Sequence, residues 1–204
     1  MKGTFKPSRK GTRHPLLMYR RMMDRVWKYT LVLGLVLAVA TRWHLLRERD
    51  IFGWSSNIWI FAAAALSLIV CIFAFVTRYM AYVQVREDAL RLYTPFLRLK
   101  ISYRRIRSVH PVLLQQLFPP EKSTWAQRSF IEPFYGLTAL VVELRGYPMD
   151  PNLLRLFLPK QMFSPRSPGF VIMVKDWMKF STEFDSLHGA WLQNQGMRQQ
   201  TGKG

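Results

Sequence analysis

The longest uncharged stretch of the chain, residues 52–77, consists almost entirely of apolar side chains. A helix of this length rises about 1.5 Å per residue and reaches about 39 Å, more than the roughly 30 Å of a bilayer's hydrocarbon core. Trp54 and Trp59 lie near one end and Arg78 follows the other, as expected of residues at the membrane–water interface. The pattern predicts a transmembrane helix over residues 54–77.

A second apolar stretch lies closer to the N-terminus. Residues 29–41 are uncharged but too short to span a bilayer alone. Lys28 and Arg42 flank them, and the long side chains of both can reach water from a helix end. A helix over residues 28–46 therefore becomes long enough. The two stretches together predict a transmembrane hairpin within residues 28–78.

A cleaved signal peptide is the alternative explanation of the first stretch. Ala38 and Ala40 form a small-residue pattern typical of a cleavage site, and basic residues precede the apolar stretch. Against this reading, the basic segment before it is unusually long for a signal peptide. We expect the helix to be retained.

Charge predicts the orientation of the hairpin. The chain carries a formal net charge of +18, and Lys and Arg exceed the acids both before the first apolar stretch and after the second. Because basic flanks stay in the cytoplasm, we expect a multi-pass protein of the cell membrane with both ends cytoplasmic and the turn at residues 47–51 outside. An anionic inner leaflet would attract these flanks. No nucleic-acid partner is expected, because the basic residues are scattered among hydrophobic ones on a membrane-bound chain.

Both ends of the chain are predicted to lack a packed structure. Residues 1–27 read as a basic cytoplasmic arm, in which residues 1–13 are polar and should be disordered. From Pro15 an amphipathic helix is expected, either as a membrane-surface anchor or simply as the basic flank of the first span. Residues 198–204 are expected to form a disordered tail.

Residues 79–197 are predicted to form one cytoplasmic α+β domain. Short stretches rich in apolar residues and bounded by Gly, Pro or Asp predict strands over residues 81–86, 90–93, 98–104, 137–144, 153–158 and 170–174. A helix capped by Thr182 should follow, with one apolar face formed by Phe184, Leu187, Trp191 and Leu192. This order predicts a strongly bent sheet or small barrel capped by the C-terminal helix.

Residues 82–92 (YVQVREDALRL) and 101–109 (ISYRRIRSV) resemble the opening of bacterial PH-like membrane proteins. In that family a strand, a turn with Asp and a second strand lead into a Y-x-x-I-x-S-V segment. A transmembrane hairpin typically precedes the domain. The resemblance covers residues 28–110 and suits a terminal helix containing Trp191, so it implies a PH-like fold without naming a ligand. The insertion at residues 111–136 departs from the family pattern.

No catalytic or metal-binding motif is recognisable in the chain. The four histidines lie in four separate segments that are far apart in the sequence, which argues against a zinc site. Phosphate-loop, dinucleotide-binding, nucleophile-elbow and zinc-peptidase motifs are all missing from the sequence. We therefore expect no catalytic residues, no metal and no cofactor. The predicted function is non-enzymatic: a membrane protein whose PH-like domain binds a protein partner or an anionic lipid surface. The alternative is a small accessory subunit of a larger membrane complex.

Two groups of residues are candidate binding sites. The first is basic and surrounds the first predicted strand turn: Arg91, Arg98, Lys100 and Arg104. Alternation would place the last three on one face, and PH domains that bind inositol phosphates carry a similar cluster, because guanidinium and ammonium groups complement phosphate. A solvated strand face is the alternative.

The second candidate lies in the insertion, where large apolar groups gather in a Pro-containing segment: Leu117, Phe118, Trp125, Phe130 and Phe134. Such residues either dip into the membrane interface or bind a protein partner, or else pack beneath the sheet as core. The sequence leaves these alternatives open.

Overall fold

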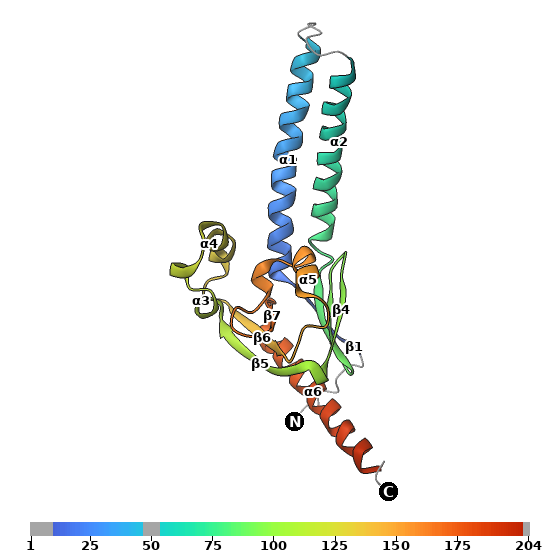
Figure 1. Cartoon of the computed structure of the whole chain (residues 1–204), viewed down its shortest axis with the longest axis vertical. Coiled ribbons are helices and arrows are strands. Elements are labelled where there is room, and N and C mark those ends of the chain that lie inside the picture. The colour runs from blue at the N-terminus through green and yellow to red at the C-terminus, as the bar shows by residue number, and fades with distance from the viewer. Residues whose placement is uncertain (1–9, 47–53, 202–204) are drawn as a thin grey trace, which may run out of the picture. The chain divides into compact units, whose positions relative to one another are not determined.

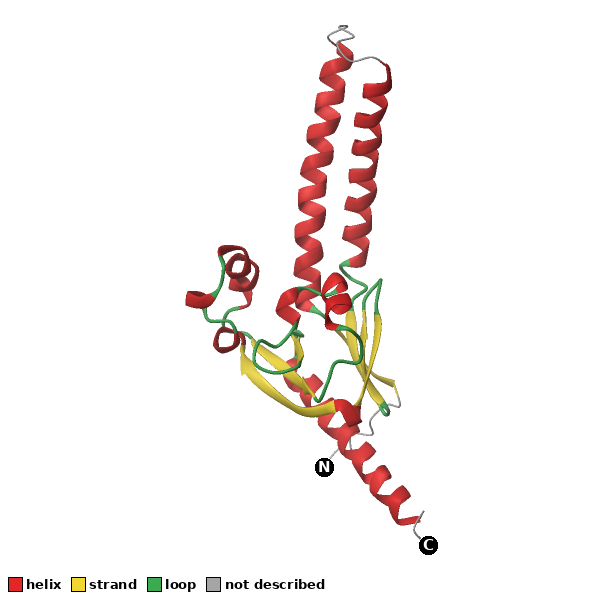
Figure 2. Cartoon of the chain, in the orientation of Figure 1, coloured by secondary structure: helices red, strands yellow, loops and turns green. Residues whose placement is uncertain are grey.

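A computed structural model describes residues 10–46 and 54–201 of the chain. It confirms the mixed α+β class, with two antiparallel sheets of four and three strands and no closed barrel (Figures 1 and 2). The described residues divide into two compact units. One is Arg20–Tyr79, and the other combines the residues up to Tyr19 with those from Met80 onward.

Two long helices, α1 (Leu17–Leu46) and α2 (Trp54–Thr77), make up the unit Arg20–Tyr79 (Figure 1). Small and polar side chains bring the helices together. The Ser67 hydroxyl donates to the carbonyl oxygen of Thr30 at 2.7 Å, and a Cβ added at Gly34 would lie 3.5 Å from the Ser67 oxygen. The Cys71 thiol donates to the carbonyl oxygen of Trp27 at 3.5 Å. Close backbone approach at small residues is the usual way in which helices associate in lipid.

An ion pair joins the two helices where α2 ends. Arg78 Nη1 lies 3.0 Å from Asp24 Oδ1, and both side chains are mostly buried. The Arg78 guanidinium also lies over the rings of Phe75 and Tyr79, 4.5 Å and 4.4 Å from their centroids. The only acid of α1 is therefore neutralised by the first cation after α2.

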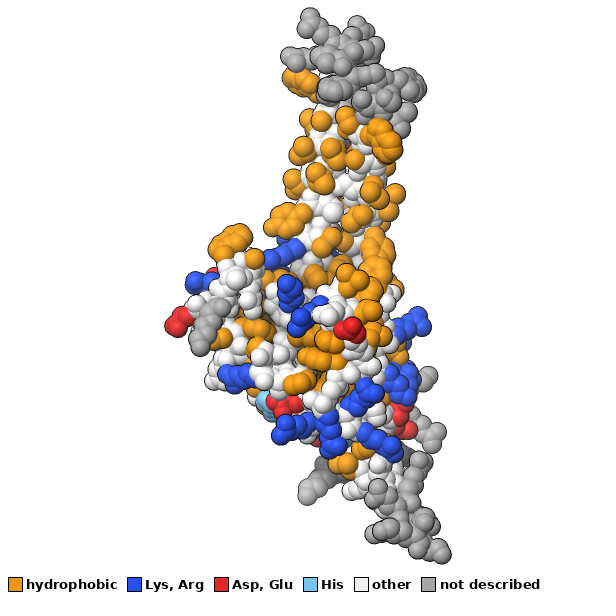
Figure 3. Space-filling model, viewed as in Figure 1, with side chains coloured by type: hydrophobic (Ala, Val, Ile, Leu, Met, Phe, Trp, Pro, Cys, Tyr) orange, Lys and Arg blue, Asp and Glu red, His pale blue; other side chains and the backbone are white. Residues whose placement is uncertain are grey.

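The outer surface of the helical hairpin is apolar on both helices (Figure 3). Exposed large side chains include Val32, Leu35, Val36 and Val39 on α1, and Leu66, Ile69, Ile72 and Val76 on α2. The polar residues Thr41, Ser67 and Thr77 are buried instead. A helix pair in water shows the opposite distribution. Among the described helices, one segment, Trp59–Thr77, is long and apolar enough by length and composition to cross a membrane.

The four-stranded sheet unites segments from both sides of the helical hairpin. Its order is β1 (Lys10–Pro15), β2 (Tyr82–Arg86), β3 (Ala89–Tyr93) and β4 (Arg98–Ser102), each pairing antiparallel with the next. In the first pair His14 lies opposite Val83 and Pro15 opposite Tyr82. The predicted disorder is therefore wrong for residues 10–13, which form a strand; residues 1–9 and the predicted turn at 47–51 lie outside the described residues.

The second sheet holds β5 (Ile106–Leu113), β6 (Thr138–Leu144) and β7 (Gly169–Ile172) in that order. Short helices occupy the connections: α3 (Leu114–Leu117), α4 (Trp125–Ile131) and α5 (Pro151–Phe157). The strand predicted over residues 153–158 is wrong, because the chain there forms α5. Asp150 caps this helix by accepting from the Asn152 backbone N–H at 3.0 Å, and Pro151 opens it, a combination that favours a helix start.

The C-terminal helix α6 (Trp177–Thr201) packs its apolar stripe against the sheets. Phe180, Phe184 and Leu187 are buried, whereas Leu192, predicted on this face, is exposed. Trp191 is half-buried, with its ring 5.7 Å from that of Tyr103. The helix begins before Thr182 and continues to Thr201, so the predicted tail is helical at residues 198–201; residues 202–204 lie outside the described chain.

A buried carboxylate on α6 holds strand β1 in place. Glu183 Oε1 accepts from the Thr12 backbone N–H at 2.6 Å, and Oε2 lies 3.1 Å from His14 Nε2. The His14 ring also meets Phe180 edge-on, with centroids 5.2 Å apart. Local patterns do not reveal this contact of His14, because 169 residues separate it from Glu183.

Replacing Glu183 should loosen this attachment. Glu183→Ala leaves the partly buried Thr12 backbone N–H and the buried His14 ring without their acceptor, so we expect a loss of about 1–3 kcal/mol in the free energy of unfolding. Urea denaturation of the detergent-solubilised chain measures it. Asp185→Ala on the exposed side of the same helix is the matched control and should change little. Equal effects of the two substitutions would contradict a specific role for Glu183.

Candidate functional site

Strands β3 and β4 present a basic face. Arg91 lies directly opposite Lys100, and Tyr93 lies opposite Arg98. Side chains alternate along a strand, so these four residues share one face of the sheet while their neighbours, such as Leu92, are buried on the other. Cross-strand neighbours approach to about 5 Å, so the cations are held close together.

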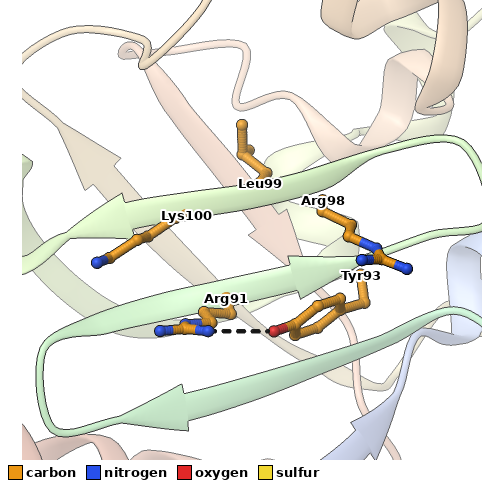
Figure 4. Close-up of a pocket in the computed structure, with 5 residues that line it drawn as sticks. All are labelled: Arg91, Tyr93, Arg98, Leu99 and Lys100. Atoms are coloured by element: carbon orange, nitrogen blue, oxygen red, sulfur yellow. Dashed lines mark hydrogen bonds between the residues drawn. The ribbon is translucent and has the colours of Figure 1, made fainter.

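These side chains line a shallow hollow of about 270 Å³, together with Leu99 (Figure 4). The hollow continues toward β2 as an aromatic surface. The ring of Tyr93 stacks on that of Tyr82, with centroids 4.8 Å apart, and the Arg13 guanidinium of β1 lies 5.0 Å from the Tyr82 centroid. The basic face therefore includes β1, which precedes the helical hairpin in the sequence, as well as the strands that follow the hairpin.

One acid partly balances the cations. Asp88, in the turn between β2 and β3, lies 2.7 Å from Lys100 Nζ and 3.6 Å from Arg91 Nη2. Partial burial opposes ionisation of Asp88, but the Lys100 hydrogen bond and the charges of Lys100 and Arg91 outweigh it, so the pKa of Asp88 lies below its ordinary value. Within the described part of the chain Arg98 forms no ion pair.

Hydrogen bonding also orders the hollow. Arg91 Nη1 donates to the Tyr93 hydroxyl oxygen at 3.4 Å, and this bond lowers the pKa of Tyr93. The guanidinium of Arg91 is thus held between Asp88 and Tyr93. Arg91 and Lys100, which Asp88 holds in place, and Arg98 together line one hollow with several N–H donors, and phosphate oxygens accept from such groups.

The predicted cluster is only partly assembled. Arg104 falls in a 3-10 turn, η1 (Tyr103–Arg105), because β4 ends at Ser102 and the two-residue alternation stops there. It is exposed and is not among the residues lining the hollow. The cluster also surrounds the β3–β4 hairpin rather than the first strand turn, since β1 precedes the helical hairpin.

Sequence reasoning missed Asp88, Tyr93 and Tyr82 as parts of this site. Alternation in residues 82–93 across the tight turn at Glu87 and Asp88 was the available signal, because it puts Tyr82 and Tyr93 on the face of Arg91. The contribution of Arg13 depends on a long-range pairing that local patterns do not reveal.

In the insertion the structure separates core residues from exposed ones. Leu117, Phe118 and Phe130 are buried and Phe134 is half-buried, whereas Trp125 is 84% exposed. Trp125 opens helix α4, which Thr124 caps by accepting from the Gln127 backbone N–H at 3.4 Å. Three of the five predicted contact residues therefore pack as core, and Trp125 is the one fully available for a contact.

No family model, curated protein or solved structure matches the chain. Among residues 10–46 and 54–201, no group of three or more His, Cys, Asp or Glu side chains is placed to hold a metal ion.

The low pKa of Asp88 should depend on Lys100. Lys100→Ala removes the hydrogen bond and the nearest positive charge, so the pKa of Asp88 should rise toward its ordinary value. Carboxyl carbon chemical shifts followed against pH report this directly. Lys100→Arg keeps the charge and should leave the pKa low. An unchanged pKa in Lys100→Ala would show that the ion pair does not form in solution.

Proposed function

We propose that this chain is a non-enzymatic protein of the cell membrane, in which a transmembrane hairpin carries a cytoplasmic, PH-like α+β domain. The domain binds phosphate-bearing anionic lipid headgroups through the basic face of β3 and β4. The pairing of β1 with β2 is the observation that carries the proposal.

The pairing constrains how the chain crosses the bilayer. Residues joined by backbone hydrogen bonds in one sheet lie on the same side of a membrane, since no open sheet edge is stable in lipid. The chain between Pro15 and Tyr82 must therefore cross an even number of times. Because Trp59–Thr77 is a candidate span, α1 must supply the return crossing. The apolar outer surface of both helices supports this, and a cleavage near Ala40 would detach β1 from its sheet.

The basic flanks support a cytoplasmic domain. Lys and Arg predominate on both sides of the hairpin, and such segments remain in the cytoplasm, where the leaflet is anionic. The two sheets and the packed C-terminal helix agree with the PH-like resemblance. A binding role fits the hollow better than catalysis, because the residues lining it include no carboxylate and no histidine, and Asp88 beside it is engaged by Lys100.

One feature of the helical hairpin favours an alternative function, that of an accessory subunit of a larger membrane complex. An apolar groove of about 420 Å³ runs between α1 and α2 and is lined in part by Gly34, Ala38, Ala64 and Ala65. Small residues of this kind accept another helix in lipid. Mass measurement of the native protein in mild detergent tests this alternative, which requires a hetero-complex of defined mass.

Loss of the basic face should weaken headgroup binding. The full chain in neutral nanodiscs is mixed with vesicles containing phosphatidylglycerol, and bound vesicles are counted by co-flotation. Each basic residue near an anionic surface contributes about 1 kcal/mol, so Arg98→Ala with Lys100→Ala together remove about 2 kcal/mol and should reduce binding by about thirtyfold. Salt should release the wild-type chain, because exposed charges are screened beyond about 8–10 Å.

A charge-matched control separates specific binding from general attraction. Arg145→Ala with Lys175→Ala removes the same charge from exposed positions outside the hollow and should have a smaller effect. Competition by free glycerol phosphate tells whether the phosphate alone is recognised or the bilayer surface is needed. Equal losses in the two double variants would show that the hollow is not the binding site.

A further inference from the structure

Exposed apolar side chains gather where the β3–β4 hairpin meets helix α5. Phe96, in the turn between these strands, is 56% exposed, and its ring lies 6.2 Å from that of Phe157. On α5, Leu153 and Leu156 are 49% and 77% exposed. Figure 1 shows α5 beside the end of β4, in agreement with the ring contact. We call Phe96, Leu153 and Leu156 the apolar tip.

The orientation of α5 on the domain explains why Leu153 and Leu156 are exposed. Leu154 and Leu158 are buried and hold the helix on the domain. Residues three and four apart share a helix face, so Leu153, Leu156 and Phe157 form a neighbouring stripe beside the buried one. Contiguous exposed apolar groups of this size on a folded domain generally mark a contact surface.

The strand register places the apolar tip at the end of the sheet from which the chain enters the membrane helices. Tyr82 lies opposite Tyr93, and Tyr93 lies opposite Arg98, so the turn holding Phe96 extends beyond the start of β2. Thr77, the last residue of α2, precedes Tyr82 by five residues, which span at most about 18 Å. If α2 spans the bilayer as proposed, this short link keeps the start of β2 within about 18 Å of the end of the span.

Basic side chains flank the apolar tip. Arg98 begins β4 immediately after the turn, and Arg155 lies on α5 between Leu153 and Leu156 with its guanidinium over the Phe163 ring, 5.8 Å from the centroid. Apolar groups bordered by cations fit the interface of an anionic bilayer, where the former enter the acyl boundary and the latter contact phosphates.

We propose that the apolar tip inserts into the headgroup region of the chain's own membrane and holds the domain against the bilayer. This inference rests on the proposed membrane function and extends it, since it assigns the bilayer surface to a second part of the domain. Arg98 lines the basic hollow and begins β4 directly after the turn that carries Phe96, so insertion would bring the hollow to headgroup level.

A spin label at residue 152 tests the proposal without altering the tip. Asn152 is exposed one helical turn before Leu156. The full chain, with Cys71→Ser as background, is labelled at Asn152→Cys and reconstituted into vesicles containing phosphatidylglycerol. Collision with oxygen should exceed collision with a water-soluble nickel chelate. Leu153→Ser with Leu156→Ser should return the label to water.

Two further labels serve as references for water and for lipid. A label at Glu87→Cys, in the turn at the opposite end of the sheet, should collide with the nickel chelate. A label at Ile69→Cys on α2 should collide mainly with oxygen. If the label at residue 152 is as exposed to water as the label at residue 87, while the label at residue 69 lies in lipid, the inference is wrong but the membrane hairpin stands. Water exposure at residue 69 would overturn the membrane hairpin and this inference with it. Retained insertion in Arg98→Ala with Lys100→Ala would show that the tip acts independently of the basic hollow.

Discussion

The pairing of β1 with β2 is the interaction on which the rest of the molecule depends. It joins residues 10–15 to residues 82–86, and the whole helical hairpin is inserted between these partners. The sequence after the hairpin therefore lacks the first strand of the sheet, because that strand precedes α1. Glu183 strengthens the same connection from α6 by accepting from Thr12 and approaching His14. In the proposed membrane arrangement, the helices inserted between two paired strands tie the folding of the domain to the number of crossings.

The basic face is a consequence of the same sheet. Alternation along β3 and β4 buries leucines and leaves Arg91, Tyr93, Arg98 and Lys100 on the opposite side. Asp88 holds two of these cations in place, which orders the hollow but lowers its net charge. Binding of an anion would therefore compete with Asp88, while Arg98 remains free to contact it. The hairpin turn next to Arg98 carries Phe96, so the proposed polar and apolar contacts with a bilayer lie at one end of the domain.

Local patterns predicted much of the fold. The apolar stretch at residues 54–77, the alternation in residues 81–93 and the C-terminal helix all correspond to observed elements, because each depends on neighbouring residues. Three features depended on distant partners and were missed: strand β1, the His14–Glu183 contact and the position of Arg13. Residues 153–158 were misread as a strand because their apolar density concealed the cap at Asp150. Of the predicted basic cluster, Arg91, Arg98 and Lys100 line one hollow, and Arg104 is excluded by the end of β4.

Thiol accessibility in intact cells shows whether β1 and β2 pair on the same side of a membrane that the chain crosses twice. Single cysteines at Thr12, Glu48 and Lys175 in a Cys71→Ser background are treated with a membrane-impermeant maleimide. The account predicts labelling at residue 48 and protection at residues 12 and 175 until the membrane is permeabilised. Labelling at only one of residues 12 and 175 would place the two segments on opposite sides and contradict the account.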